Sequence, residues 1–525
     1  MLHESMSPSL RIATAVSLLG LGLGAFVDGC SLSNVSVTSC AGDAQCAAAF
    51  GAGSTCAEGF CSQPAGCTTG HECRRMVGGG ACVNGACVSQ FPIDPACKTI
   101  FEPSDLFSKS LIGPNAPLVI GGIFSLDATD DVARTQAVRL AVREINQAGL
   151  NQGQKLGIVF CDNGGPGNVA SGDARAALNA HALDYLAGTL GTPYIVGPLT
   201  STDAFSLVNE LKKKSLPTVI ISPSATSPSL TTVDDRLHPN DPYGLFWRTC
   251  PSDLLQGKVL ATNVIGMDAT ITSVTAVFIN NAYGQGLATV FQSSYAGQTF
   301  LVPYDDAAIV DQAGLAKLAA AASAKGGGAV LLIAEHGNIA SKILGAMVGL
   351  PIAAKPFFFT DGSKDGGLLD PMLAPGVQAI LKKAQGTAPA SPQGLPNYMF
   401  FASSLLTQFG IDGASVSFLA QAYDAAYVGA FGVVLASKDG TQYDGLDVAA
   451  GMAHLSAGDL VPLNGVSAWP TGKGLLTTKG QINVDGVSGH LDFDAKTGEA
   501  PGRIVVWSID TTAEVFKDGI TIPPG

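Results

Sequence analysis

From residue 118 onward, short apolar runs alternate with longer amphipathic segments. The apolar runs predict β-strands at 118–124, 156–160, 194–196, 219–221, 274–279, 298–302, 329–334 and 356–360. Between them, apolar side chains recur at helical spacing, as in segment 131–147, where one face carries Val138, Ala141, Val142 and Ile145. Strands that are apolar on both faces are typical of parallel sheets covered by helices on both sides, so the pattern predicts an α/β fold.

The alternation pauses at 246–249 and starts afresh with a helix predicted over 254–264. This pause predicts two α/β units joined at that point. Residues 364–455 are predicted to be mostly helical, with a loop rich in Gly, Pro and Ala at 386–396. The tail contains HLDFD from His490 and RIVVWSI from Arg503, and both alternate between apolar and polar residues as strands do.

Two hydroxyl-rich turns bracket one predicted helix. GPLTST (197–202) and SPSATS (222–227) each follow a predicted strand. Thr200, Ser201 and Thr202 occupy the predicted helix start, where hydroxyls cap free N–H groups and where a carboxylate can bind. Both turns would lie at the carboxyl ends of parallel strands, where ligands of open α/β sheets bind. Helix capping explains either turn alone, whereas the pair in this order favours a binding site.

The N-terminus has the pattern of an export signal. Arg11 precedes an apolar run of 16 residues over 12–27, which is short for a membrane span and typical of a signal peptide. We therefore predict a signal peptide over 1–29 and a short linker over 30–39. Cys30 resembles the lipidated cysteine of bacterial lipoproteins, although Asp28 replaces the small residue expected there. The protein is thus expected outside the cytoplasm, in the periplasm or on the cell surface, with a lipid anchor at Cys30 and simple secretion as the alternative.

A cysteine-rich repeat follows over 40–97. Its two units have the spacings C-x5-C-x9-C-x4-C and C-x5-C-x8-C-x4-C, formed by Cys40, Cys46, Cys56, Cys61, Cys67, Cys73, Cys82 and Cys87. In an exported chain this density predicts two disulfides per unit, with the pairing left open. Zinc is the competing explanation, but C-x2-C pairs are absent from this sequence. The module suggests a spacer or a protein contact. Five prolines over residues 92–117 mark the domain boundary, and segment 98–116 is predicted to be a linker.

Composition excludes several classes of function. The formal net charge is −13, which argues against nucleic acid as a partner. The sequence lacks G-x-S-x-G, H-E-x-x-H and P-loop motifs, so we expect no enzyme, no cofactor and no bound metal. DFDAKTGE (492–499) is a poor calcium loop, because Lys496 stands where an oxygen ligand belongs.

Several motifs in a fixed order give a family resemblance. AVREINQAG, GPLTS, ISPSATSPSL, FWRTCPSDLLQG, NAYGQGL, TDG at 360–362, AYDAAYVGA and GVSGHLDFDAKTG span residues 117–525. In this order they resemble type I periplasmic solute-binding proteins of the branched-chain amino acid (leucine-binding-like) family. The resemblance implies an α/β fold of two parallel-sheet lobes joined by three crossovers. Lobe 1 would comprise about 117–247 and 363–470, and lobe 2 about 250–360 and 488–525.

The resemblance also implies a ligand site between the lobes. Ser201 and Thr202, with Ala225 and Thr226, would hold the carboxylate or an equivalent acceptor of the ligand. From lobe 2, Tyr283 would close over the ligand and Asp361 would pair with its ammonium. His336, or its neighbour Glu335, would face the ligand from the loop after 329–334; a surface position at a helix start is the alternative for His336. Phe124 and Ser125, at the end of the first strand, could touch the ligand too, although FSLDAT replaces the family's pattern there. Tyr423 is expected to pack between helices.

The remaining choices concern function and three cysteines. The resemblance implies capture of a small polar solute, an amino acid or amide-like compound, for an ABC-type permease. A ligand-sensing receptor subunit on the same scaffold is the alternative, because the cysteine-rich module suggests a protein contact. Cys97, Cys161 and Cys250 remain outside the repeat. We expect a Cys161–Cys250 disulfide and a free Cys97.

Overall fold

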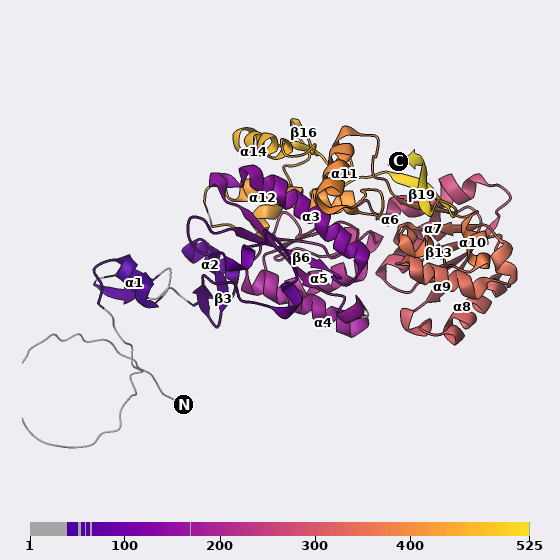
Figure 1. Ribbon diagram of the computed structural model, residues 1–525, viewed down its shortest axis with the longest axis horizontal. Coiled ribbons are helices and arrows are strands. Elements are labelled where there is room, and N and C mark those ends of the chain that lie inside the picture. The colour runs from indigo at the N-terminus through magenta and orange to yellow at the C-terminus, as the bar shows by residue number, and fades with distance from the viewer. Residues whose placement is uncertain are drawn as a thin grey trace, which may run out of the picture.

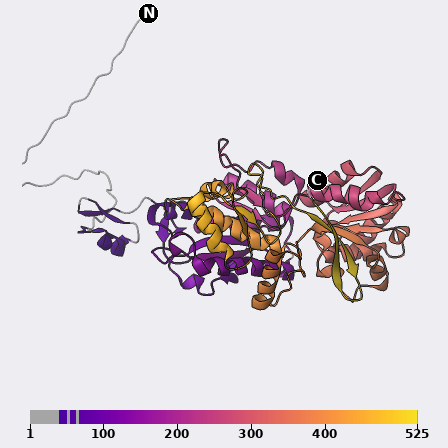
Figure 2. The same cartoon turned by 90° about the horizontal axis from the view of Figure 1, so that it is seen from above.

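The computed structural model describes residues 39–50, 54–57, 59–62, 66–168, 170–440 and 442–523. The predicted signal peptide and Cys30 lie outside these residues. Two α/β lobes lie side by side, and the cysteine-rich repeats lie at the end of lobe 1 that is remote from lobe 2 (Figures 1 and 2). The predicted α/β fold with two lobes and an N-terminal disulfide-rich module is confirmed.

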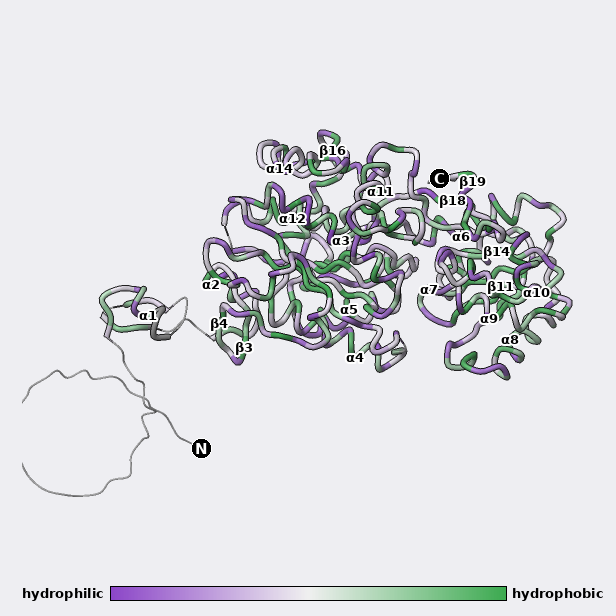
Figure 3. The backbone as a smooth tube through the Cα atoms, in the orientation of Figure 1, coloured by the Kyte–Doolittle hydropathy of each residue, from purple (hydrophilic) through white to green (hydrophobic). Residues whose placement is uncertain are grey.

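Lobe 1 is built on a six-stranded sheet in the order β10-β9-β8-β6-β7-β5. Its strands are β5 (Ile100–Glu102), β6 (Leu118–Phe124), β7 (Leu156–Asp162), β8 (Tyr194–Val196), β9 (Val219–Ser222) and β10 (Phe246–Arg248). All neighbours are parallel except β5, which pairs antiparallel with β7. β6 is buried along its whole length, as its unbroken apolar sequence predicts, and the middle of lobe 1 is strongly hydrophobic in Figure 3.

Helices cover the lobe 1 sheet. They are α3 (Thr129–Ala148), α4 (Gly172–Leu183), α5 (Ser201–Lys213), α11 (Pro396–Phe409), α12 (Leu419–Ala436), α13 (Gly445–Met452) and α14 (Ala468–Lys479). α12 is long and apolar enough to cross a membrane, but 89% of it is buried inside the lobe. Tyr423 lies in this helix and donates a hydrogen bond to Glu144 of α3 at 2.5 Å, so it packs between helices as expected. A short parallel pair, β16 (Leu460–Pro462) and β17 (Asn483–Asp485), flanks α14.

Lobe 2 is built on a seven-stranded sheet in the order β12-β11-β13-β14-β15-β18-β19. The strands are β11 (Ser273–Ile279), β12 (Gln298–Tyr304), β13 (Ala329–Ile333), β14 (Phe357–Phe359), β15 (Gln385–Pro389), β18 (Ile504–Asp510) and β19 (Val515–Ile522). The helices are α6 (Asp253–Val259), α7 (Ala282–Ser294), α8 (Gln312–Lys325), α9 (Gly337–Met347) and α10 (Pro375–Leu381). The tail strand predicted from RIVVWSI is therefore β18, whereas HLDFD forms only isolated bridges.

The chain crosses between the lobes three times. The first crossing follows β10, and the third runs beside it, because Arg248 bridges to Glu499. The second crossing follows β15. This strand belongs to the lobe 2 sheet, although the sequence predicted a loop over 386–396. Lobe 2 therefore extends to Pro389, past the expected return to lobe 1 at about residue 363. The pairing of β15 with β18 explains this difference. The sequence of β15 has little intrinsic strand preference, and its strand conformation follows from hydrogen bonding to neighbouring strands.

The repeats at the N-terminus are two small disulfide-linked units. The first contains α1 (Asp43–Phe50), β1 (Thr55–Ala57) and β2 (Phe60–Ser62), and the second contains α2 (Gly70–Val77), β3 (Ala81–Val83) and β4 (Ala86–Val88). The pairs are Cys40–Cys56, Cys46–Cys61, Cys67–Cys82 and Cys73–Cys87. This confirms two bridges per unit, with the first cysteine joined to the third and the second to the fourth. The sulfurs that zinc would need are therefore paired with one another.

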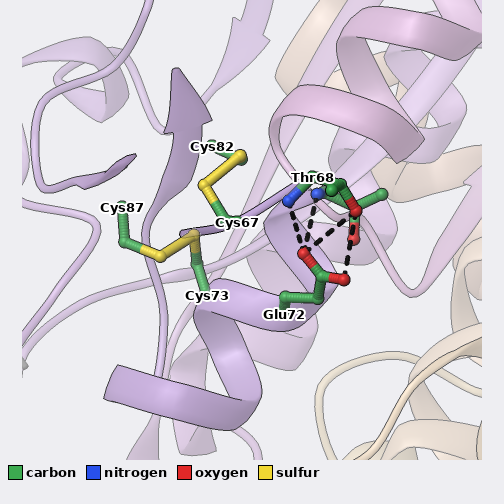
Figure 4. Close-up of a disulfide and its surroundings, with 7 residues drawn as sticks. Cys67, Thr68, Glu72, Cys73, Cys82 and Cys87 are labelled. Atoms are coloured by element: carbon green, nitrogen blue, oxygen red, sulfur yellow. Dashed lines mark hydrogen bonds between the residues drawn. A yellow bond between two sulfur atoms is a disulfide. The ribbon is translucent and has the colours of Figure 1, made fainter. Parts of the chain in front are cut away.

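The second unit begins with a capped helix. The Glu72 carboxylate accepts hydrogen bonds from the backbone N–H groups of Thr68 and Thr69 and from the Thr68 hydroxyl (Figure 4). The two disulfides, Cys67–Cys82 and Cys73–Cys87, tie this helix start to the hairpin beside it (Figure 4). Such caps and disulfides stabilise a unit that is too small to form a large hydrophobic core.

The expected Cys161–Cys250 disulfide is wrong. Cys161 at the end of β7 pairs with Cys97, and Cys250 is a free, fully buried thiol. The physical reason is the antiparallel pairing of β5 with β7, which lies just after Cys97 and brings that residue to the edge of the lobe 1 sheet. The predicted linker 98–116 is therefore anchored to lobe 1 through β5, and its Leu106 and Leu111 are buried.

Candidate functional site between the lobes

The first hydroxyl-rich turn starts α5 as the sequence predicts. Thr200 is the N-cap, and its hydroxyl accepts a hydrogen bond from the backbone N–H of Asp203 at 3.1 Å. Ser201 is buried, and its Oγ accepts a hydrogen bond from the N–H of Ser227 at 3.1 Å. The two hydroxyl-rich turns therefore touch each other. Thr202 is exposed, so the structure does not bring its side chain into this contact.

The second turn reaches the start of lobe 2. Ala225 and Thr226 are both buried. The Thr226 hydroxyl donates to Asp253 Oδ2 at 2.8 Å, and the Asp253 N–H donates to the Thr226 carbonyl at 2.8 Å. Asp253 is the first residue of α6, directly after the first crossing. Thr226 thus lies at the boundary between the two lobes.

An arginine from the first crossing fixes this turn. Arg248 is fully buried, and its Nη1 donates to the carbonyls of Ala225 and Ser227 at 2.9 Å. Its Nη2 pairs with the Glu499 carboxylate from the third crossing. One guanidinium therefore couples the turn around Thr226 to two of the three crossings, as the planar fork of arginine allows.

Lobe 2 supplies a buried tyrosine and a buried carboxylate. Tyr283 lies in the first turn of α7, which Asn281 caps. Its hydroxyl lies 2.8 Å from both Thr360 Oγ1 and Asp361 Oδ1. Burial raises the pKa of Asp361, and the hydrogen bond from Tyr283 opposes that rise. Burial also raises the pKa of Tyr283, so the phenol remains a hydrogen-bond donor at neutral pH.

The two halves meet directly. Ser227 Oγ donates to the carbonyl of Ala282, the residue before Tyr283, at 2.7 Å. The structure therefore brings Ser201, Ala225 and Thr226 of lobe 1 to the same boundary as Tyr283 and Asp361 of lobe 2. The two lobes therefore contact each other at this boundary.

His336 is placed differently from these residues. Its side chain is 54% exposed at the start of α9, and Nδ1 lies 3.9 Å from Asp365 Oδ2. The preceding residue, Glu335, accepts a hydrogen bond from Asn281 Nδ2 at 2.7 Å. Burial raises the pKa of Glu335, and the nearby His336 lowers it. Of the two residues that the sequence offered here, Glu335 is the one that contacts the α7 cap beside the boundary.

A polar network in lobe 1 escaped the sequence analysis. Arg175 Nε donates to the Asp203 carboxylate at 2.9 Å, and its Nη2 donates to Ser125 Oγ at 3.2 Å. Asn163 and Asn179 also donate to Asp203. Arg175 and Asn179 come from α4, Asp203 from α5, and Ser125 and Asn163 from the ends of β6 and β7, so only the folded chain brings them together. Ser125 therefore joins this network, whereas Phe124 is buried against Phe160 in the core.

Comparisons with known proteins agree with this architecture. The family model described as "Receptor family ligand binding region" matches residues 133–512. A search of curated proteins found no match. Among solved structures, a leucine-binding protein from Thermotoga maritima shares 16% identity at a TM-score of 0.58, over 78% of this chain and 99% of that one.

Two further solved structures show the same fold with different bound molecules. A branched-chain amino acid transporter substrate-binding protein from Streptococcus pneumoniae, in complex with isoleucine, shares 20% identity at a TM-score of 0.55, over 78% of this chain and 99% of that one. An ABC transporter solute-binding protein from R. palustris, in complex with benzoate, shares 16% identity at a TM-score of 0.54, over 78% of this chain and 97% of that one.

These matches cover most of both lobes. The matched family groups ligand-binding regions and not enzymes, in agreement with the lack of catalytic motifs in the sequence. The family model spans more than half of the 525 residues and includes all three crossings and both halves of the boundary described above. The chain therefore belongs to the family described as "Receptor family ligand binding region", and its fold is that of type I periplasmic binding proteins.

Proposed function

We propose that the protein captures a small polar solute, an amino acid or an amide-like compound, between its two lobes. The observation that carries this proposal is the meeting of two chemically different surfaces at one boundary. Lobe 1 offers the buried Ser201 and the N–H groups at the start of α5, beside the turn that contains Thr226, and these groups suit a carboxylate. Lobe 2 offers Tyr283 and Asp361, which suit an ammonium.

Binding to both surfaces would favour the closed arrangement. A ligand shifts the equilibrium between open and closed lobes by the difference in its affinity for the two states. A solute that contacts only one lobe gains nothing from closure, whereas one that bridges Thr226 and Asp361 gains contacts from both. The leucine and isoleucine named for two of the solved neighbours have a carboxylate and an ammonium, and the same arrangement would suit such a solute here.

We further propose that the protein works outside the cytoplasm as the receptor of an ABC-type importer. The described disulfides support an oxidising compartment. A lipid anchor at Cys30 would hold the protein at the membrane near its permease. The solved neighbours from S. pneumoniae and R. palustris are named as transporter binding proteins, and this role is extended to the present chain as a proposal.

A sensing subunit is the second candidate. One observation favours it: the second cysteine-rich unit is fixed rigidly to lobe 1, with His71 bound to Thr218 and Arg75 paired with Asp444. A rigid module at the end of the molecule suits a contact with another protein. Co-purification from membranes would separate the roles, because a permease would support import and a kinase would support sensing.

Mass spectrometry of the solute retained by the purified chain tests the capture itself. We expect one small compound released on denaturation, with a molar ratio approaching one. Asp361→Ala should remove binding of ammonium-bearing compounds, because the cation would lose its buried partner. Absence of any retained or rebinding solute across amino acids, amides and aromatic acids would reject capture as the function.

A further inference from the structure

The polar network of lobe 1 joins two strand ends at the point where the strand order of its sheet reverses. β6 is the first strand of the parallel sheet, and the next two strands in the chain, β7 and β8, pair on opposite sides of it. Ligands of open α/β sheets bind outside the carboxyl ends of strands at such a reversal. Ser125 follows β6, and Asp203 lies in the first turn of α5, the helix after β8. Arg175 bridges the two, because Nη2 donates to Ser125 Oγ at 3.2 Å and Nε donates to Asp203 at 2.9 Å.

Lobe 2 has a corresponding polar bridge. β11 is the first strand of its sheet, with β12 on one side and β13 on the other. Asn281 follows β11 as the cap of α7, and Glu335 follows β13. Asn281 Nδ2 donates to Glu335 Oε1 at 2.7 Å, so the pair joins the two strand ends. Each lobe therefore carries a polar bridge across its own reversal of strand order.

The two bridges face each other across the boundary. α5 and α7 begin beside them, and the turn that approaches α5 also reaches α7, where Ser227 donates to the Ala282 carbonyl. Burial lowers the pKa of Arg175, but the hydrogen bonds and charge of Asp203 raise it above its ordinary value, and the charge of Glu335 adds to that rise. Burial raises the pKa of Glu335, and the charge of Asp203 contributes to this. The charges of the two bridges thus act on each other from opposite lobes.

Each bridge has one polar atom without a partner among the described residues. The side chain of Arg175 is 19% exposed, and its Nε and Nη2 make all of its contacts there, so Nη1 is a free donor. Asp131, whose charge also acts on Arg175, is paired with Arg134. Glu335 is partly buried, and since Asn281 binds Oε1, Oε2 accepts no hydrogen bond in that part of the chain. A free donor of lobe 1 is therefore opposite a free acceptor of lobe 2.

We propose that Arg175 and Glu335 select the far end of the captured solute, and that this end carries a neutral carboxamide or urea group. The inference rests on the proposed capture of a solute between the lobes, and it adds a second polar subsite to the groups at Thr226 and Asp361. A primary amide has a carbonyl that accepts from Arg175 Nη1 and an N–H that donates to Glu335 Oε2. Both hydrogen bonds involve a charged group, which makes them stronger than bonds between neutral groups.

Other chemical groups match these two atoms less well. A carboxylate has acceptors only, and it would meet the negative charges of Asp203 and Glu335. An ammonium has donors only, and it would lie beside the guanidinium of Arg175. An aliphatic end would remove both polar atoms from water without supplying a hydrogen bond, which costs free energy. A direct ion pair between Arg175 and Glu335 on closure is the competing explanation, and it predicts no preference among these groups.

Four amino acids with the same carboxylate and ammonium test the subsite on the purified full-length chain. L-Glutamine, L-glutamate, L-lysine and L-leucine differ in the side chain alone, so titration calorimetry at pH 7 compares the far end directly. We expect L-glutamine to bind at least about tenfold more tightly than the other three. Glu335→Gln should weaken L-glutamine binding by about tenfold, because the amide N–H loses its charged acceptor. The same change should strengthen L-glutamate binding, because a like charge is removed.

Glu210→Gln is the matched control, because Glu210 lies in the last turn of α5 and pairs with Lys213 at 3.0 Å. All four affinities should stay those of the unmodified chain. If Glu335→Gln fails to fold, the ranking of the four amino acids by the unmodified chain decides the matter.

Other outcomes separate the subsite from the capture on which it rests. L-Leucine, L-glutamate or L-lysine binding as tightly as L-glutamine would reject the subsite and leave capture standing. An equal loss for all four in Glu335→Gln would also reject it, since Glu335 would then act only in an ion pair that closes the lobes. If none of the four binds, the solute retained by the purified chain decides: a neutral amide or urea group in it supports the subsite, and the lack of one rejects the subsite alone. No binding together with no retained solute would reject capture itself.

Discussion

His71 is a buried, neutral histidine at the contact between the second cysteine-rich unit and lobe 1. Its Nε2 lies 3.0 Å from Thr218 Oγ1, and that hydroxyl donates its single proton to the Thr192 carbonyl. Nε2 must therefore carry a proton and donate to Thr218. Nδ1 is buried and has no partner among the described residues. A second proton on Nδ1 would bury a charge beside Arg74 and Arg75.

This environment predicts a pH-dependent stability. Burial and the two arginines lower the pKa of His71 well below its ordinary value of 6.5. The unfolded chain then binds a proton before the folded chain does, so stability is complete above pH 6.5 and falls as pH decreases below it. Thermal unfolding between pH 8 and 5 should show a loss of up to about 1.4 kcal/mol per pH unit. His71→Gln, which can still donate to Thr218, should flatten that dependence.

The control for this titration is His238→Gln, because His238 is an exposed histidine whose side chain is 65% accessible. The stability of the His238→Gln variant should depend on pH in the same way as that of the unmodified chain. Equal slopes for the unmodified chain and His71→Gln would contradict the role of His71.

At the scale of residues, the sequence predicted which side chains lie between the lobes, but it did not predict which contacts they make there. Ser201, Thr226, Tyr283 and Asp361 belong to turns whose local patterns place them at strand and helix ends, and the structure brings them together. The partner of Cys161 depends on which edge strand pairs with β7, and no local pattern encodes that contact. The pairing of Arg175 with Asp203 likewise depends on two elements that only the fold brings near each other.

At the scale of elements, α2 is held against lobe 1 by close backbone packing and charge. Arg74 is buried, donates to the carbonyls of Gly191 and Tyr443, and lies over the Tyr443 ring at 5.2 Å. Gly70 packs directly on Gly191: a Cβ at Gly70 would lie 2.5 Å from the Gly191 nitrogen. The helix can approach this closely only because neither glycine has a side chain.

Gly70→Ala should therefore detach α2 from lobe 1. Backbone atoms on the other side cannot move aside as a flexible side chain could, and overpacking of this kind costs about 1–3 kcal/mol. Limited trypsin digestion measures the outcome, because Arg74 becomes a cleavage site once α2 leaves its contact. Gly188→Ala is the control, since a Cβ there meets nothing within 4 Å. Equal cleavage rates for the two variants would contradict this packing.

Element by element, the sequence predicted the long parallel strands and missed β5 and β15. β6, β7 and β11 are continuous apolar runs, and their burial follows from composition alone. β5 and β15 are short, contain or adjoin proline, and are strands because neighbours offer them hydrogen bonds. Tertiary pairing decided both, which explains why 98–116 was predicted as a linker and 386–396 as a loop.

At the scale of the whole molecule, α7 and the turn after β9 form a small contact between the lobes. Ser227 donates to the Ala282 carbonyl, and Gly286, one turn further along α7, faces Pro228. A Cβ at Gly286 would lie 2.7 Å from Pro228 Cδ and 3.1 Å from Ser227 Oγ. Both of those atoms belong to lobe 1, so the restriction exists only while the lobes touch.

Gly286→Ala should therefore shift the molecule toward an open arrangement without damaging either lobe. Alanine suits the middle of a helix better than glycine, by roughly 0.5–1 kcal/mol, so lobe 2 itself should not lose stability. The clash arises in the closed state alone, and any solute that needs closure should bind more weakly in proportion to that cost. Small-angle scattering should give a larger radius of gyration for the variant, and its affinity for the retained solute should fall. Gly345→Ala in α9 is the matched control, because Gly345 is exposed and a Cβ there meets nothing within 4 Å. A variant as compact as that control would show that Gly286 and Pro228 do not limit closure.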